Sequence, residues 1–191
     1  RPPRSTQGVS SAASDVYKRQ VHNMQHRIGL SSGRIVTGNM GSTMRMNYTM
    51  MGDTVNLAAR LEASAKQYGI YIQVSESTYK VVKDRFDWRF LDYVRVKGKK
   101  LPVKVYELIA AKGKMNDTDK AVTEAFSQAQ KLYFKQDWDK AINGFKETKE
   151  LENMFPGRSE NPSNIYLKRC YQLKENPPGK DWDGVWVLTK K

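Results

Sequence analysis

Residues 52–68 read GDTVNLAARLEASAKQY, and this stretch decides the fold that we expect. Its apolar residues recur at intervals of three or four: Leu57, Leu61, Ala65 and Tyr68. This spacing places them on one side of an α-helix, with polar residues on the other side. We therefore predict a helix over about residues 55–68, with Asp53 or Thr54 as its amino-terminal cap.

Short strand-like runs that end near glycine precede this helix. They are RIGLSSG at residues 27–33 and RIVTGNMGS at residues 34–42, and a polar stretch then leads to NYTMMGD at residues 47–53. Glycine at the end of an apolar run is typical of a turn. We therefore expect two strands before the helix.

Three more strand signals and a second helix follow. IYIQVS at residues 70–75 is typical of a buried strand, and Ser75 can cap a short helix over residues 76–82. Two strands are then expected at about residues 90–96 and 103–109, joined by the basic turn KGKKLP. The order strand, strand, helix, strand, helix, strand, strand predicts an α/β fold, an α+β sandwich of helices on a mixed sheet, rather than a helical bundle or a β-barrel.

The chain after residue 112 has a helical pattern. Six apolar residues repeat at spacings of three and four: Ala121, Ala125, Phe126, Ala129, Leu132 and Tyr133. A second amphipathic helix contains Trp138 and Phe145, and a third covers about residues 165–173. These helices resemble a single tetratricopeptide-like hairpin with one further helix. The last segment, NPPGKDWDGVW at residues 176–186, is expected to fold back onto the helices or onto the α/β domain.

These changes in pattern divide the chain into four parts. Residues 1–20 have no sustained period and are expected to be a disordered or non-native lead. Residues 21–111 form the α/β domain, whose sheet is expected to lack its beginning. Residues 112–118 are a polar linker, and residues 119–191 form the helical extension.

Composition narrows the class of protein. The chain has 191 residues, of which 39% are hydrophobic, enough for one or two globular domains. Its apolar runs are far shorter than the roughly 20 residues of a membrane-spanning helix, and it has no secretory signal. We therefore expect a cytoplasmic protein, with any membrane anchor in an upstream segment outside this sequence. Its one cysteine, Cys170, excludes an internal disulfide and is expected to be a buried thiol.

The net charge of +13 raises the question of a polyanionic partner. The densest group of cations lies in the hairpin near residue 97: Arg95, Lys97, Lys99, Lys100 and Lys104. Such a group is either a solvated hairpin face or a phosphate-binding site. Aromatic and basic residues do not interleave as they do in nucleic-acid-binding motifs, which argues against an RNA or DNA partner.

Asn56 and Arg60 lie four residues apart, so the predicted helix brings an amide and a guanidinium onto one face. Taken alone, this pair is either an exposed polar face or a ligand contact. The GxxxxGK[ST] phosphate loop, the GxGxxG dinucleotide loop and the nucleophile elbow of hydrolases are missing. Their absence argues against a kinase, a simple NTPase and a serine hydrolase.

Several of these motifs occur together in a known order. Residues 27–79, with the GDTVNLAARLE block at their centre, and the hairpin LDYVRVKGKKLPVKVYEL at residues 91–108 resemble the class III nucleotidyl cyclase catalytic domain. The resemblance covers about residues 27–109 and implies an amino-terminally truncated form of the ferredoxin-like cyclase fold. The extension resembles the carboxyl-terminal extension of some bacterial membrane-anchored adenylate cyclases.

The resemblance implies roles for five residues. The family converts a nucleoside triphosphate into its 3′,5′-cyclic monophosphate and pyrophosphate at a site shared by two catalytic domains. By resemblance, Asn56 orients the ribose and Arg60 stabilises the charge that develops on the α-phosphate. Arg34 and Lys97 match the residues that bind the phosphate oxygens, and Thr49 occupies the purine-selecting position, with ATP preferred over GTP.

The family also uses two metal ions, Mg²⁺ or Mn²⁺, held by two aspartates. Those aspartates and the base-selecting lysine lie upstream of the region that matches Arg27, and nothing in residues 1–26 resembles them. The chain is therefore expected to be a fragment of an adenylate cyclase, inactive by itself, whose intact form is a homodimer. Each site would combine the metals and Arg34 of one subunit with four residues of the other: Thr49, Asn56, Arg60 and Lys97.

Two other classes stay open. The first is a non-catalytic regulatory or scaffold module, in which the cyclase domain is degenerate and the helical extension binds a protein partner. The second is an RNA- or DNA-binding protein that uses the basic hairpin, whose binding would weaken with added salt.

Overall fold

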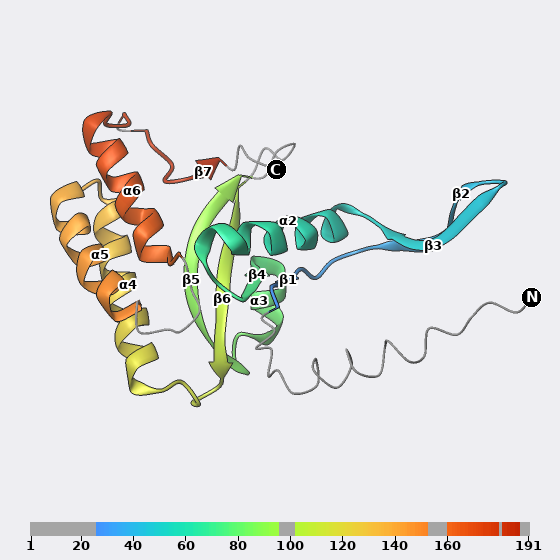
Figure 1. Ribbon diagram of the computed structural model, residues 1–191, viewed down its shortest axis with the longest axis horizontal. Helices are drawn as coiled ribbons and strands as arrows, with labels where there is room; N and C mark the ends of the chain where they lie inside the picture. The colour runs from blue at the N-terminus through green and yellow to red at the C-terminus, as the bar shows by residue number, and fades with distance from the viewer. Residues whose placement is uncertain (1–25, 96–101, 153–159, 180, 188–191) are drawn as a thin grey trace, which may run out of the picture.

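The computed structural model describes residues 26–95, 102–152, 160–179 and 181–187. A mixed sheet carries helices, and three further helices lie beside it (Figure 1). The α/β class expected from the sequence is confirmed. In chain order the elements are β1 (Ile28–Leu30), β2 (Val36–Ser42), β3 (Arg45–Met51), α2 (Asp53–Tyr68), β4 (Ile72–Ser75), α3 (Glu76–Val82), β5 (Phe86–Arg95), β6 (Val103–Ala111), α4 (Asp117–Phe134), α5 (Trp138–Glu152), α6 (Pro162–Glu175) and β7 (Trp186–Val187).

The main sheet has the strand order β1-β4-β6-β5-β7. The pairs β4–β6 and β6–β5 are antiparallel, whereas β1 and β7 run parallel to their neighbours β4 and β5. Strands β2 and β3 form a separate antiparallel hairpin, in which Val36 pairs with Met51 and Gly38 with Thr49. Figure 1 shows this hairpin extending away from the main sheet beyond the amino-terminal end of α2.

Helix α2 confirms the helix expected from its apolar stripe. Leu61, Ala65 and Tyr68 are buried, and Leu57 is partly buried beside them. They pack against Leu91, Val94 and Val105 of the sheet and Ile70 in the turn that follows α2. Because the stripe lies on one side only, α2 keeps its other side free of the core.

The expected cap of α2 is wrong. Gly52 holds the cap position with φ 147°, and no side chain caps the helix. At Gly52 the chain turns directly from β3 into α2, in a backbone conformation that residues with a Cβ rarely adopt. The turn, rather than Asp53 or Thr54, therefore sets where the helix begins.

Strand β3 was not predicted, because a polar stretch leading to the helix was expected at this place. All seven of its residues are exposed. The alternation of Met46, Tyr48 and Met50 with polar residues is the signal that could have found it. Among residues 26–52, which the structure describes, three strands rather than two therefore precede α2.

Helices α2 and α3 cover opposite faces of the sheet. Ser75 caps α3 as expected, since its hydroxyl accepts a hydrogen bond from the Thr78 N–H at 3.4 Å. Tyr79 of α3 stacks on Tyr106, with ring centroids 3.9 Å apart, whereas the neighbouring Val105 lies in the core under α2. Successive residues of a strand point to opposite faces, so the two helices lie on different sides.

The helical extension has a core of its own. This core joins apolar and aromatic side chains of α4, α5 and α6: Phe126, Ala129, Tyr133, Ala141, Ile142, Phe145, Tyr166, Leu167 and Cys170. Three helices at the expected positions are therefore present. The terminal segment folds back in both of the expected ways, because Trp182 packs against this core and β7 pairs with β5.

Strand β5 begins at Phe86, four residues before the expected start, and it carries buried charges. Arg89 is ion-paired with Glu107 of β6 and with Glu152 of α5. A bulge lies between Phe90 and Asp92, so that the adjacent Leu91 and Asp92 are both buried. The start of this strand was not predicted, because its charged residues do not fit the apolar pattern expected of a buried strand.

Strand β1 lies directly against the backbone of α2. A Cβ at Gly29 would be 2.2 Å from the Ala58 carbonyl oxygen and 2.4 Å from the Glu62 nitrogen. Both are main-chain atoms, which cannot move aside as a flexible side chain can. Glycine at position 29 therefore sets how closely α2 packs on this edge of the sheet.

We expect Gly29→Ala to lower the free energy of unfolding by about 1–3 kcal/mol, because the added methyl group has no space. Gly38→Ala is the matched control, since nothing lies within 4 Å of a Cβ at that position. It should change the free energy by less than about 0.5 kcal/mol. Urea unfolding of the purified chain measures both, and equal effects of the two substitutions would contradict the close packing of β1 on α2.

Stability should also fall at alkaline pH. Burial raises the pKa of the Cys170 thiol from 9.0 to about 12. Between these values the folded chain keeps a proton that the unfolded chain releases, so the free energy of unfolding decreases as pH rises above about 9. Urea unfolding at a series of pH values should show a shallower decrease for Cys170→Ala than for the unchanged chain. The same slope in both would argue against a buried thiol.

Candidate active site

Four of the five residues expected in the site lie in the described part of the chain, and two of them are on segments that meet at the start of α2. Strand β3, which carries Thr49, runs into α2 through Gly52. The loop after β1, which carries Arg34, lies against the same end of the helix. A Cβ at Gly33 would be 2.3 Å from Thr54 Oγ1, and one at Gly52 would be 3.2 Å from the Arg34 carbonyl oxygen.

Asn56 and Arg60 lie on the exposed side of α2, in its amino-terminal half. The Asn56 N–H donates to the Gly52 carbonyl at 3.1 Å, which places Asn56 in the first turn. Arg60 lies about one turn, or about 6 Å, further along the axis. The first turn of a helix carries partial positive charge, and Arg60 adds a full charge. The same turn also contains the acidic residue Asp53, so Arg60 is the group that brings positive charge to this half of α2.

The fifth expected residue, Lys97, lies outside the described residues, as do Lys99 and Lys100. The two flanking members of the basic group have partners within the chain. Arg95 donates to Asp183 at 2.8 Å, and the Lys104 ammonium lies 5.7 Å from the centre of the Tyr93 ring. These two cations therefore belong to the junction of β5 with the rest of the chain rather than to a free phosphate-binding face.

The β2–β3 hairpin exposes a series of large apolar side chains next to Thr49. They include Val36, Met44, Met46, Tyr48, Met50 and Met51, each more than half exposed. Met46, Tyr48 and Met50 alternate along β3 and so share one face of it. A contiguous apolar surface of this kind is typical of an interaction site.

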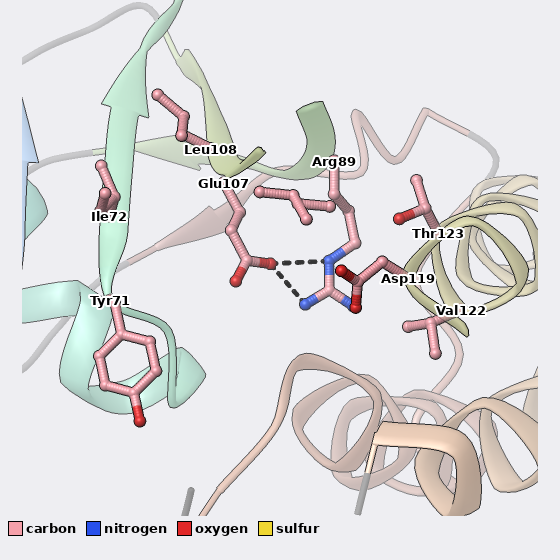
Figure 2. A pocket seen from close by; sticks show the side chains of 9 residues that line it. Tyr71, Ile72, Arg89, Glu107, Leu108, Asp119, Val122 and Thr123 are labelled. Atoms are coloured by element: carbon pink, nitrogen blue, oxygen red, sulfur yellow. Dashed lines mark hydrogen bonds and ion pairs between the residues drawn. The ribbon is translucent and has the colours of Figure 1, made fainter. Parts of the chain in front are cut away.

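A pocket of about 220 Å³ lies at a different place, between the sheet and α4 (Figure 2). Tyr71, Ile72 and Glu107 line its sheet side, and Asp119 and Thr123 line its α4 side. Figure 2 also shows the Arg89 guanidinium at its base, joined to Glu107 by hydrogen bonds of 2.9 and 2.5 Å. None of the expected site residues lines it. This pocket therefore lies at the contact between the α/β domain and the helical extension.

The described residues do not fit a site for two metal ions. Within residues 26–95, 102–152, 160–179 and 181–187, no group of three or more His, Cys, Asp or Glu side chains is placed to hold a metal ion. No helix of the described part is both long and apolar enough to cross a membrane.

Comparison with known proteins identifies the family. Residues 8–110 match the family model of the adenylate and guanylate cyclase catalytic domain, which is more than half of the chain. The chain belongs to this cyclase family. The recognition of a class III cyclase domain is thereby confirmed. The match begins within residues 1–20, which were expected to be a lead and which lie outside the described residues.

Curated relatives include adenylate cyclases. The chain is 31% identical over 153 residues to the terminal-differentiation-specific adenylate cyclase of Dictyostelium discoideum, covering 76% of this chain and 7% of that protein. It is 36% identical over 93 residues to adenylate cyclase 1 of Rhizobium meliloti, covering 49% of this chain and 14% of that protein. The chain thus spans a small part of the length of these relatives. Guanylate cyclases of Plasmodium falciparum and Toxoplasma gondii also match, so membership of the family leaves the purine open.

Solved structures of cyclases are also similar. The crystal structure of the adenylyl cyclase CyaB from P. aeruginosa is 27% identical, with a TM-score of 0.42, and the similarity covers 58% of this chain and 56% of that chain. The tetratricopeptide-like character of the extension is not tested by these comparisons and stays a prediction.

The buried charges around Asp92 were missed by reasoning from the sequence. Arg169 of α6 donates to Asp92 at 2.6 Å, and both side chains are at most 5% exposed. The only available signal was an arginine within an otherwise partly apolar helix and an aspartate within a strand. A single sequence gives no reason to pair them, since 77 residues separate them.

Proposed function

We propose that this chain is part of an adenylate cyclase that converts ATP into 3′,5′-cyclic AMP and pyrophosphate. The observation that carries the proposal is the position of Asn56 and Arg60 on the exposed side of α2, in the half of the helix that directly follows the strand with Thr49. An anionic phosphate chain at this end of the helix would be met by cations and hydrogen-bond donors.

Each residue suits one part of the reaction. Cyclisation moves negative charge onto the α-phosphate and the leaving pyrophosphate, and Arg60 supplies a planar, permanently charged donor for it. Asn56 would hold the ribose so that its 3′-oxygen faces the α-phosphate, which is an effect of orientation. Arg34 and Lys97 would bind the oxygens of the triphosphate.

The metal ions of the reaction, Mg²⁺ or Mn²⁺, would be held by aspartates outside residues 27–109. Bound metal ions lower the pKa of a coordinated hydroxyl and neutralise phosphate charge. This chain's own contribution is to bind and orient the nucleotide and to stabilise the transition state. The chain by itself is accordingly proposed to be a fragment with negligible turnover.

The active form is proposed to be a homodimer formed through the cyclase domains. The exposed apolar face of β3 supports this, because a two-stranded hairpin is marginally stable in water unless another surface covers it. Thr49 lies on the same strand. A second copy packed on the hairpin would bring its own Arg34 and metal ions to the Thr49, Asn56, Arg60 and Lys97 of the first.

ATP is proposed as the substrate. By resemblance, Thr49 contacts the purine, and this supports ATP as the substrate. A hydroxyl can donate or accept a hydrogen bond, so Thr49 by itself is compatible with either purine. We also propose a cytoplasmic location, where nucleoside triphosphates are available, with any membrane anchor in a separate upstream segment. The outer surface of the extension would serve a protein partner, and nucleic acid is not proposed as a partner.

Arg60→Ala in the full-length protein should lower kcat about 100-fold or more, because one donor to the developing charge is lost. Lys66→Ala is the matched control, since Lys66 is an exposed cation in the last turn of the same helix. The assay is cyclic AMP formation from ATP, with GTP tested in parallel, together with urea unfolding to establish that both variants fold. Unchanged output of Arg60→Ala would refute the assignment, and a full-length protein with no activity on either nucleotide would favour the regulatory or scaffold module.

Tyr48→Ser should weaken dimerisation about tenfold or more, because a large aromatic side chain at the centre of an interface carries much of its binding energy. Tyr171→Ser provides the control, since Tyr171 is also exposed but lies on α6. Sedimentation equilibrium of the full-length protein measures the dissociation constant. Equal dissociation constants for the two variants would show that the hairpin does not lie in the dimer interface.

A further inference from the structure

Asp92 of β5 lies where α2, the sheet and the helical extension meet. One of its carboxylate oxygens, Oδ2, accepts hydrogen bonds of 2.6 Å from the Tyr68 hydroxyl of α2 and of 2.6 Å from Arg169 of α6. The other oxygen accepts from the Tyr93 N–H at 2.8 Å and lies 3.1 Å from the Tyr166 hydroxyl. We call these four buried residues the Asp92 cluster: Asp92, Tyr68, Tyr166 and Arg169.

Arg169 joins three elements through one guanidinium. Besides Asp92, it donates to the Tyr68 hydroxyl at 3.1 Å, and its guanidinium carbon lies 4.2 Å from the centre of the Trp186 ring of β7. The extension therefore contacts the last residue of α2 directly. A planar guanidinium with several fixed donors holds such a geometry more rigidly than a single ammonium could.

Both elements held by the cluster continue into the proposed site. Helix α2 carries Asn56 and Arg60 and ends at Tyr68. Strand β5 ends at Arg95, where Asp183 binds it and β7 pairs with it, and Lys97 follows two residues later. A shift of α2 against β5 would therefore move Asn56 and Arg60 together relative to the sheet.

We propose that Arg169 is a positioning residue for cyclisation, acting through Tyr68 and Asp92 to fix α2 against β5. The helical extension then contributes to the geometry of the catalytic domain. This inference rests on the proposed function, because it assigns Arg169 an effect on the residues that act there. Errors of about 1 Å in the placement of reacting groups can cost about 100-fold in rate.

The chain offers a matched comparison for a purely structural role. Arg89 is also buried on β5, is also ion-paired with carboxylates and also ties the sheet to the extension, through Glu152. Its ion pairs are with Glu107 of β6 and Glu152 of α5, and none of its interactions described above is with α2. Loss of either arginine removes a buried charge. Of the two, only loss of Arg169 removes a hydrogen bond to Tyr68 and leaves the Asp92 carboxylate that Tyr68 binds without its ion-pair partner.

The first experiment compares Arg169→Met with Arg89→Met by hydrogen–deuterium exchange in this 191-residue chain. We expect amides of Asp53–Tyr68 to exchange about tenfold faster in Arg169→Met and to stay unchanged relative to the rest of the domain in Arg89→Met. Equal exchange of this helix in the two variants would overturn the proposal.

The second experiment measures cyclase kinetics of the same variants in the full-length protein. Arg169→Met should lower kcat about 10- to 100-fold while KM for ATP changes less than about threefold, and Arg169→Lys should restore part of the loss. Parallel losses in Arg169→Met and Arg89→Met would mean that Arg169 contributes stability only, and would overturn the positioning role.

A milder pair of variants applies if the methionine variants fail to fold. Tyr68→Phe removes the hydroxyl that links α2 to Asp92, and Tyr166→Phe removes a hydroxyl from the other oxygen of the same carboxylate without touching α2. Faster exchange of α2 and lower kcat only in Tyr68→Phe would support the proposal, and equal effects would overturn it. If the exchange result is as expected while the unchanged full-length protein forms no cyclic nucleotide, the contact stands and the proposed function fails.

Discussion

The buried carboxylate of Asp92 is the interaction on which the arrangement of the two halves depends. A charge removed from water costs several kcal/mol unless partners satisfy it. Here the partners come from α2, from β5 itself and from α6, so that the charge is satisfied only when domain and extension are packed together. Burial alone would lower the pKa of Arg169, but the charge of Asp92 raises it, and the net pKa is well above the usual value. Arg169 therefore stays charged at any pH at which the chain is folded.

The bulge in β5 makes this arrangement possible. A regular strand would turn Leu91 and Asp92 to opposite faces, one into the core and one away from it. The irregularity between Phe90 and Asp92 lets both be buried and leaves the Leu91 carbonyl to accept from Gln130 at 2.7 Å and from Tyr166 at 2.8 Å. The main chain of β5 is thereby tied to α4 and α6. Bulges are frequent next to active sites, where they redirect a strand.

Helix α2 connects this interior to the site. Its apolar side is held by the sheet, its last residue by Asp92, and its start by the turn at Gly52. The other side carries Asn56 and Arg60, which are both exposed and lie outside the core. The apolar face of the neighbouring hairpin is likewise exposed in the described part of the chain. The proposed homodimer gives these two exposed surfaces a common interpretation, namely a site completed by a second domain.

The sequence by itself determined most of the helices and strands, though not β3 or β7, and the local grouping of Asn56 with Arg60. The period of the α2 stripe, the Ser75 cap and the strand patterns each depend on residues within a few positions of one another, and propensity and side-chain direction act at that range. The same locality placed Asn56 and Arg60 on one helix face. Only the tertiary structure decided the Gly52 turn, the pairing of β7 with β5, and the contact of Arg169 with Tyr68 and Asp92. Those partners lie up to 101 residues apart in the sequence. A charged residue in a strand or helix is therefore predicted to be exposed, because its burial is unfavourable unless the fold places an opposite charge beside it.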